Sequence, residues 1–352
     1  MFITKAIKCK VLDLTQHKHE LLQGEYQKFQ IYAKRQKDFG VYSYTKTTFD
    51  FKERKKARYF PQPMPLGKQV CKFKKTDNKL TNYWFRVPVK AKRGGIWLPI
   101  FAYFDFTKEW EIRDSKLIKK DNQFIIILSL RKEVSLKKSY SNVLAIDLGE
   151  KVMATVCGSM ENSSPQFFGR NIRGIRRHYA WLRKRLGNLK LLKKIRQMND
   201  KESRVVDNIL HNVTRKILRL AIKTDSIIVL GNLKNIRKSA RGKRFKRIVS
   251  NWSYYKFTQY LTYKANEQGI QVIKINEHYT SKTCSRCGEF GNRKSQGLFK
   301  CPNCSYEINA DVNGARNILK RTLDYMSNVG AVAFCLKNGN DNWLCQSESF
   351  KH

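Results

Sequence analysis

The stretch VLAIDLGEKVMATVCG (143–158) decides the fold that most of this 352-residue chain is expected to adopt. A short apolar run ends in Asp147-Leu148-Gly149, and a second run follows after Glu150, which is the pattern of a tight hairpin. A third strand near 166–170 would complete a three-stranded meander. The carboxylate of Asp147 then ends an apolar strand, where its charge is costly to desolvate unless it holds a cation or a partner.

Helices and strands alternate after this meander. The run SIIVLGNL (226–233) is continuously apolar, as expected of a strand buried on both faces. The other predicted elements are helices at about 171–198, 202–223 and 252–268, a strand at 269–275, and a helix from about Asp311. The second helix carries Val205, Ile209, Val213, Ile217 and Leu220 at helical spacing. Three strands, then alternating helices and strands, predict an α/β fold of the RNase H type over 141–326, and 327–352 is expected to be a loosely ordered tail.

Two cysteine pairs carry the most specific motif of the chain. Cys284-Ser-Arg-Cys287 is followed, after thirteen residues, by Cys301-Pro-Asn-Cys304. Four thiolates on two tight turns are typical of a closed, tetrahedral and structural zinc site. We therefore expect a zinc ribbon at about 280–308, inserted in the α/β domain of residues 141–326. The other cysteines are interpreted as ordinary packing residues: Cys9, Cys71, Cys157, Cys335 and Cys345.

The first 140 residues have a different pattern. Residues 1–12 alternate as in a strand, 15–38 form a basic helical pattern, and 82–136 return to strands, with turns expected at Gly94-Gly95 and Asp121-Asn122. The chain up to residue 140 is therefore predicted to be a small β-domain with a helical insert at about 13–80.

Charge restricts the partners. The chain has 71 Lys and Arg against 28 Asp and Glu, a net charge of +43, spread over every segment. Nucleic acid is the commonest neutraliser of such a charge; a basic proteome or a membrane surface is the alternative. No segment approaches the ~18 apolar residues of a membrane span, and the N-terminus lacks a signal-peptide layout. We therefore expect a soluble, cytoplasmic and nucleoid-associated protein.

Two aspartates are candidate ligands of a catalytic metal. Asp147 ends a strand and Asp311 opens a helix, and each has a simpler interpretation, as a turn carboxylate and as a helix N-cap. Together, at the two ends of an RNase H pattern, they predict a Mg²⁺ site, because Mg²⁺ prefers hard oxygen ligands.

Four phrases of the sequence are similar to those of the TnpB family, which is related to the type V CRISPR effectors: LAIDLG, LGNLKNIRK, YTSKTCSRCGEFGNR and FKCPNCSYEINADVNGARNI. The resemblance implies a magnesium-dependent RuvC site, a guide RNA from the transposon end, and double-stranded DNA cleaved beside a short transposon-adjacent motif. It also implies an N-terminal, wedge-like β-barrel with a helical recognition insert that grips RNA and DNA. It leaves open whether the protein is a monomer or a homodimer.

The chain departs from the family pattern at one catalytic position. The family has a Glu at the end of the second motif strand, where this chain has Gly231-Asn232. Either the site is inactive, or another acid substitutes. Glu277, at the end of the next strand, is the candidate we favour over a solvated loop acid; Glu150 and Asp225 are weaker candidates.

A basic loop lies beside the predicted site and is interpreted as a grip on a nucleic-acid strand, with a merely solvated loop as the alternative: Arg237, Lys238, Arg241, Lys243, Arg244, Lys246 and Arg247. The aromatic residues at 252–257 are expected to pack on the sheet. The sequence thus predicts an RNA-guided DNA endonuclease using Asp147, Glu277 and Asp311. The alternatives are a nuclease-dead, guide-dependent DNA-binding repressor and a transposon-associated RNA-binding accessory protein.

Overall fold

The computed structural model describes residues 1–35, 61–76, 81, 83–103, 109–120, 122–160, 163–198, 200–233, 241–243, 246, 249, 252–293 and 297–329. The chain divides into two compact units, one of residues 2–133 and one of Met1 with 134–352. Within the described ranges, no helix is long and apolar enough to cross a membrane.

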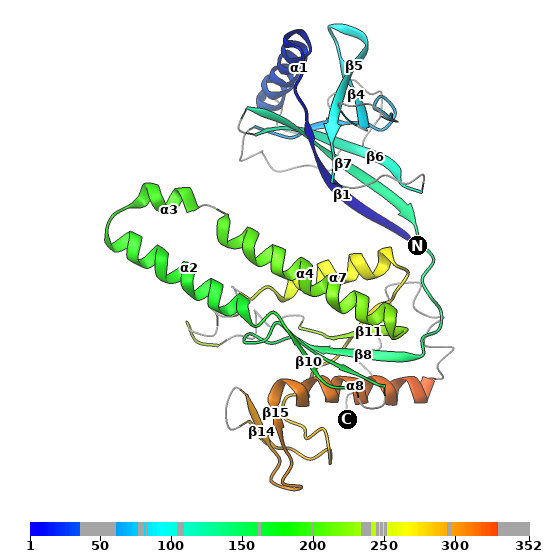
Figure 1. Cartoon of the computed structure of the whole chain (residues 1–352), viewed down its shortest axis with the longest axis vertical. Helices are drawn as coiled ribbons and strands as arrows, with labels where there is room; N and C mark the ends of the chain where they lie inside the picture. The colour runs from blue at the N-terminus through cyan, green and yellow to red at the C-terminus, as the bar shows by residue number, and fades with distance from the viewer. Residues whose placement is uncertain are drawn as a thin grey trace. The chain divides into compact units, whose positions relative to one another are not determined.

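The N-terminal unit is a seven-stranded antiparallel sheet with one long helix (Figure 1). Its strands lie in the order β2-β6-β7-β1-β5-β4-β3. The elements are β1 (Phe2–Val11), α1 (Gln16–Arg35), β2 (Met64–Leu66), β3 (Lys72–Lys75), β4 (Tyr83–Val89), β5 (Lys92–Phe101), β6 (Glu111–Lys120) and β7 (Gln123–Glu133). A helical segment after the first strand was predicted and is present as α1; most of the remaining predicted insert lies outside the described residues.

Helix α1 packs one face on this sheet. Leu22, Tyr26 and Phe29 are buried there, and Tyr26 meets Phe124 of β7 edge to face at 5.8 Å between ring centroids. Glu25 on the same helix is buried and accepts a hydrogen bond from the backbone N–H of Lys90 at 3.1 Å. The helix is thus held by apolar contacts and one satisfied carboxylate.

The turn predicted at Gly94-Gly95 is wrong, because the β4–β5 turn lies at 90–91. Both glycines belong to β5, with φ of +81° and +75°. The strand register shifts between Val87 and Val89 opposite them, and a Cβ on Gly95 would lie 2.4 Å from the carbonyl oxygen of Val87. The pair therefore forms a β-bulge, a second structure that needs residues with positive φ.

The C-terminal unit is built on a five-stranded sheet in the order β10-β9-β8-β11-β12. Its strands are β8 (Asn142–Asp147), β9 (Ala154–Gly158), β10 (Gln166–Phe168), β11 (Ser226–Gly231) and β12 (Val272–Ile275). The first three form an antiparallel meander, and β11 is parallel to both β8 and β12. The order of elements along the chain is the predicted one, and β11 is buried throughout as expected.

Helices cover both faces of this sheet (Figure 1). Leu144, Ile146, Ile228 and Leu230 lie in one core with α4 (Lys201–Lys223) and α7 (Tyr254–Glu267). The alternate strand residues Val143, Ala145, Ile227 and Val229 lie in a second core with Ile318 of α8 (Ala310–Val329). Because side chains alternate along a strand, the two apolar sets fix which helices lie above and below the sheet.

Two helix predictions need correction. The single helix predicted at 171–198 is two, α2 (Asn171–Asn188) and α3 (Leu192–Met198), separated where Lys190 has a φ of +54°. On α4, Val205 is exposed and Ile209 only partly buried, whereas the neighbouring Val206 and Leu210 are buried. Two adjacent apolar stripes fit the helical period, and the sheet selects which one is buried.

The cysteine module is a small three-stranded sheet inserted before α8. It comprises β13 (Asn292–Arg293), β14 (Leu298–Lys300) and β15 (Glu307–Asn309), paired antiparallel in that order. Strand β15 runs directly into α8, so the module is joined without a linker to the helix that carries Asp311.

Candidate active site and zinc site

Asp147 lies where the end of β8 meets helix α8. A Cβ on Gly314 of α8 would lie 2.8 Å from the Oδ2 atom of Asp147, so only glycine lets the helix approach this carboxylate so closely. Burial, and secondly the negative charge of Asp311, raise the pKa of Asp147 to about 7. A carboxylate with its charge disfavoured in this way is poised to bind a cation.

Asp311 is the second residue of α8, and it is not the N-cap. The side-chain Oδ1 of Asn309 accepts hydrogen bonds from the backbone N–H groups of Asp311 at 2.9 Å and Val312 at 3.3 Å, which is the capping role. The carboxylate of Asp311 instead accepts a hydrogen bond from the Arg293 guanidinium of β13 at 3.0 Å. Burial raises the pKa of Asp311, although the nearby positive charge of Arg293 opposes this effect.

Glu277 completes the cluster by folding back over the neighbouring strand. It lies two residues beyond β12, whose last residue Ile275 pairs with Gly231 of β11. A Cβ on Gly231 would lie only 1.4 Å from Glu277 Oε1. The Glu277 carboxylate thus occupies the volume that any side chain at position 231 would fill.

The environment of Glu277 also disfavours its charge. Burial, followed by the charge of Asp147, raises the pKa of Glu277 to about 8. Its Oε1 atom is buried and has no hydrogen-bond partner among the described residues. A buried acceptor of this kind is costly unless a proton or a cation satisfies it.

The chemistry of the three acids suits a divalent cation, although their oxygen atoms lie farther apart than the sulfur atoms of the four cysteines. Their oxygens are hard ligands. Burial raises all three pKa values, and repulsion by a neighbouring acid adds to this for Asp147 and Glu277; a bound cation relieves both effects. Over the ranges that the structure describes, only the four cysteines have ligand atoms gathered within 4.8 Å of one another. The carboxylates are spread more widely.

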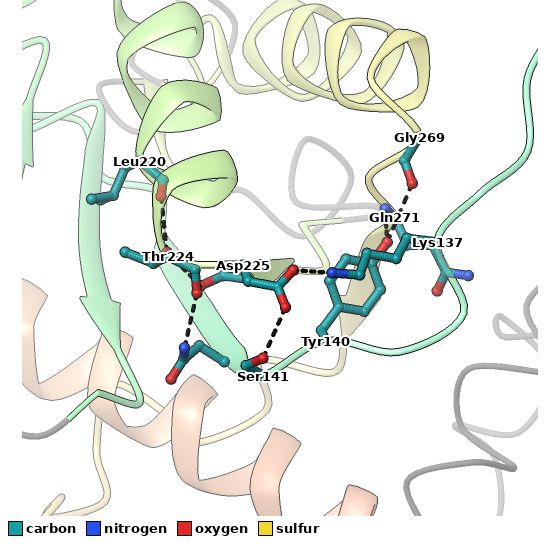
Figure 2. Close-up of polar contacts among 10 residues, drawn as sticks. Lys137, Tyr140, Ser141, Leu220, Thr224, Asp225, Gly269 and Gln271 are labelled. Carbon is teal, nitrogen blue, oxygen red and sulfur yellow. Dashed lines mark hydrogen bonds and ion pairs between the residues drawn. The ribbon is translucent and has the colours of Figure 1, made fainter.

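The two other acids considered from the sequence lie outside this cluster. Glu150 forms an ion pair with Arg173 at 3.0 Å. Asp225 precedes β11, and Figure 2 shows its carboxylate turned to Lys137 and Ser141. A six-residue strand separates Asp225 from Gly231 by roughly 20 Å. Asp225 therefore anchors the segment that enters β8 and cannot reach Asp147.

The four cysteines have the geometry of a tetrahedral metal site. The Sγ atoms of Cys284 and Cys304 lie 3.7 Å apart, and those of Cys287 and Cys301 lie 3.5 Å apart. Four sulfurs at ~2.3 Å from one zinc ion would lie about 3.8 Å from each other. Gly288, with a φ of +85°, closes the first turn by donating its N–H to the carbonyl of Cys284 at 3.0 Å. Cys9 and Cys157 are buried and Cys71 half-buried, as expected of packing residues.

Three asparagines that the sequence interpretation missed hold this site together. Asn309 caps α8, and Asn313 and Asn317 follow at intervals of four, on one face of the helix. Asn313 donates to the carbonyl of Thr283 at 2.7 Å, and its Oδ1 accepts the N–H of Ser285 at 2.9 Å. The four-residue spacing of three amides within NADVNGARN was the available signal.

Part of the basic loop predicted to grip a nucleic-acid strand lies within the described residues. Arg241, Lys243 and Lys246 are exposed, whereas Arg237, Lys238, Arg244 and Arg247 lie outside the described residues. In the aromatic segment that follows, Phe257 is fully buried in the sheet core, as expected, and Tyr255 is 61% exposed.

Comparison with known proteins shows what this arrangement is similar to. The family model described as "Cas12f1-like, TNB domain" matches residues 254–318, which include Glu277, all four cysteines and Asp311. The chain is similar in sequence to TnpB-like and Cas12f proteins. It is 35% identical over 236 residues to the CRISPR-associated endodeoxyribonuclease Cas12f1 of Sulfoacidibacillus thermotolerans, covering 61% of this chain and 55% of that protein.

A TnpB-like protein of Methanocaldococcus jannaschii is 27% identical over 234 residues, covering 62% of this chain and 83% of that protein. The TnpB resemblance stated from the motifs is therefore confirmed. The match spans about half the length of the Cas12f1 relative. Among solved structures, AacC2c1, in a complex with sgRNA and extended non-target DNA, aligns with a TM-score of 0.51 at 9% identity over 79% of this chain and 57% of that one. This similarity supports a shared mixed α/β fold.

Proposed function

We propose that this protein is an RNA-guided DNA endonuclease with a RuvC-type site formed by Asp147, Glu277 and Asp311. One similar protein is the CRISPR-associated endodeoxyribonuclease Cas12f1, and the chain matches a Cas12f1-like domain over the segment from α7 to α8. Its partners would be a guide RNA from the transposon end and a double-stranded DNA target recognised beside a short transposon-adjacent motif. A net charge of +43 suits a protein that grips a heteroduplex by its phosphates.

One observation carries the proposal: the carboxylate of Glu277 lies in the volume vacated at Gly231. The absence of an acid on β11 was the reason to consider a nuclease-dead repressor. Glu277 returns a carboxylate to that place from the adjacent strand, and its charge interacts with that of Asp147. The accessory-protein alternative offers no reason for three acids to meet at one end of the sheet.

The residues have distinct roles in this proposal. Magnesium held by the carboxylates would stabilise the attacking water and the leaving oxygen of the phosphodiester. Arg293 places a positive charge beside Asp311, where it offsets part of the negative charge of the cluster. The four cysteines would hold a structural zinc ion that folds the module presenting Arg293. The N-terminal unit would act as the wedge-like barrel with its helical insert.

The test begins with the protein purified together with its co-expressed RNA, which is then sequenced. We expect cleavage of DNA matched to that RNA in the presence of Mg²⁺, and none of unmatched DNA or by Asp147→Asn. Tight binding of matched DNA without cleavage under Mg²⁺ or Mn²⁺ would favour the repressor. Binding of RNA with no guide-dependent DNA binding would favour the accessory protein.

A further inference from the structure

An exposed aromatic pair joins the loop after Glu277 to the zinc module, and the proposed function leaves it without a role. Tyr279 follows Glu277 by two residues, and Phe290 follows the first cysteine pair. Their ring centroids are 5.6 Å apart with planes at 73°. The two residues are 48% and 63% exposed. The core of the zinc module is already supplied by the fully buried Phe299, so its folding does not explain Phe290.

The backbone of Tyr279 is strained in order to present its ring. Its φ is +62°, in the left-handed region that is rare for a bulky residue. The N–H groups of Lys282 and Thr283 both donate to the carbonyl of Tyr279 at 2.9 Å, which holds the turn in place. Glycine would adopt this conformation without strain, and strain that is kept in this way clusters at ligand-binding and catalytic sites.

This loop is fixed to the helix that carries Asp311. Asn317 donates hydrogen bonds to the carbonyls of Thr280 and Thr283, each at 2.7 Å, and Asn313 donates to Thr283 at the same distance. Both asparagines are buried. The aromatic pair therefore keeps a defined position relative to α8 and to Glu277, which adjoins the same loop.

A positive charge lies beside the pair, which suits an anionic ligand. The Lys282 ammonium lies 5.8 Å from the centre of the Tyr279 ring, and Arg286 and Arg293 are exposed on the same module. A ligand that offers flat apolar faces and negative charge together is a nucleotide, since its base stacks on aromatic rings while its phosphate meets the cations. A base within a duplex has its faces covered by its neighbours, so the fitting ligand is unpaired.

We propose that Tyr279 and Phe290 form a stacking site for unpaired bases of the strand that enters the carboxylate cluster. Because the rings meet edge to face, a base stacked on one ring meets the other edge-on. The pair would thereby hold a single strand next to Glu277 and Asp311. The position of this site relative to a cleaved bond rests on the proposed function; its binding of single strands does not.

Fluorescence of 2-aminopurine, which is quenched on stacking, tests this binding directly. A single-stranded tetranucleotide containing 2-aminopurine is titrated with the full-length protein in magnesium-free buffer. Stacking is worth ~1–3 kcal/mol per base, so Tyr279→Ala and Phe290→Ala should each weaken binding roughly 5- to 150-fold and reduce the quenching. Tyr279→Phe should behave as wild type. Tyr255→Ala, a matched control at an exposed tyrosine of the same unit, should also behave as wild type.

Tyr279→Gly separates stacking from folding. It relieves the backbone strain, so its Tm should equal or exceed that of wild type while its binding falls as in Tyr279→Ala. Unchanged quenching in the Tyr279→Ala/Phe290→Ala double variant would overturn the proposal. It would also be overturned if the wild-type protein quenched 2-aminopurine equally well inside a blunt duplex. If the double variant loses quenching but wild type cuts no matched DNA, the proposed function fails and the stacking site stands. If wild type cuts matched DNA and the double variant quenches normally, the proposed function stands and the stacking site is refuted.

Discussion

Glu277 and Gly231 share one volume: the Oε1 atom of the glutamate lies 1.4 Å from where a Cβ on the glycine would be. Position 231 must therefore stay without a side chain for Glu277 to adopt its place. We call this relationship the exchange: β11 has no carboxylate at position 231, and the acid that follows β12 occupies the space that a side chain there would fill.

The exchange can be tested by reversing it. Gly231→Ala should displace the Glu277 carboxylate and lower cleavage at least 100-fold, as far as Glu277→Gln does, because both remove the charge from its place. The double variant Gly231→Glu/Glu277→Gly returns an acid to the same volume from β11 and should recover part of the activity. The measurement is the rate at which wild type and these three variants cleave matched DNA. Normal cleavage by Gly231→Ala would contradict the exchange.

Loss of protons from the buried carboxylates should make the metal-free protein less stable as the pH rises. The pKa of Glu277 is raised from an ordinary 4.5 to about 8, and that of Asp147 from 3.8 to about 7. The folded state therefore binds more protons than the unfolded state between about pH 4 and 8, so the free energy of unfolding falls across this range. The stabilisation is fully present below the unfolded pKa values and is lost as the pH passes the folded ones.

Thermal unfolding without added divalent metal measures this dependence. The Tm should fall between pH 5 and pH 8.5, and Glu277→Gln should reduce that fall, because an amide does not titrate. Glu133→Gln, at an exposed glutamate outside the cluster, is the control for removing a carboxylate elsewhere and should not reduce the fall. A Tm that rises with pH over this range in wild type would exclude the raised pKa values.

Zinc should be needed for the module but not for the sheet. We expect about one zinc ion per chain by elemental analysis, and Cys284→Ser or Cys301→Ser should unfold the module, since structural zinc supplies folding free energy directly. Cys9→Ser, at a buried cysteine of the N-terminal unit, should leave the zinc content unchanged. Hydrogen exchange should locate the loss of protection in 283–309. Zinc-free protein with full protection there would contradict the assignment.

The asparagine contacts should couple the module to α8. Asn313→Ala leaves the N–H of Ser285 without this partner, at a cost of about 1–3 kcal/mol when buried, while the carbonyl of Thr283 keeps the hydrogen bond from Asn317. Cleavage should fall while zinc content stays at one per chain. Asn208→Ala, at an exposed residue of α4, is the control. Unchanged cleavage and stability in Asn313→Ala would remove the positioning role.

Phosphate contacts should make nucleic-acid binding strongly dependent on salt. The slope of log K against log[salt] should be steep for guide RNA, because each neutralised phosphate releases counterions. Reversing the charge of Arg241 and Lys243 together should weaken DNA binding without lowering the Tm, since both side chains are exposed. Binding equal to that of wild type would mean that these two residues of the basic loop are only solvated.

Local pattern was enough for much of this protein. The apolar run that ends at Asp147, the continuous run of β11 and the two cysteine pairs each depend on neighbours in sequence, and all three appear as expected. Errors arose where two local structures share one pattern. Gly94-Gly95 is typical of a turn and of a bulge, and the apolar residues of α4 form two adjacent stripes.

The candidate site depended on tertiary structure. Glu277 could be nominated from its place after a strand, but only the parallel pairing of β11 with β12 brings its carboxylate over Gly231. In the same way, the sequence allowed Asp311 to be either a metal ligand or a helix cap, and the structure shows that Asn309 caps α8. The ion pair between Arg293 and Asp311 has no sequence motif that predicts it. Sequence patterns record what each segment must bury; which side chains then meet depends on how separate segments pack, and that is decided across distances in the chain that no local pattern spans.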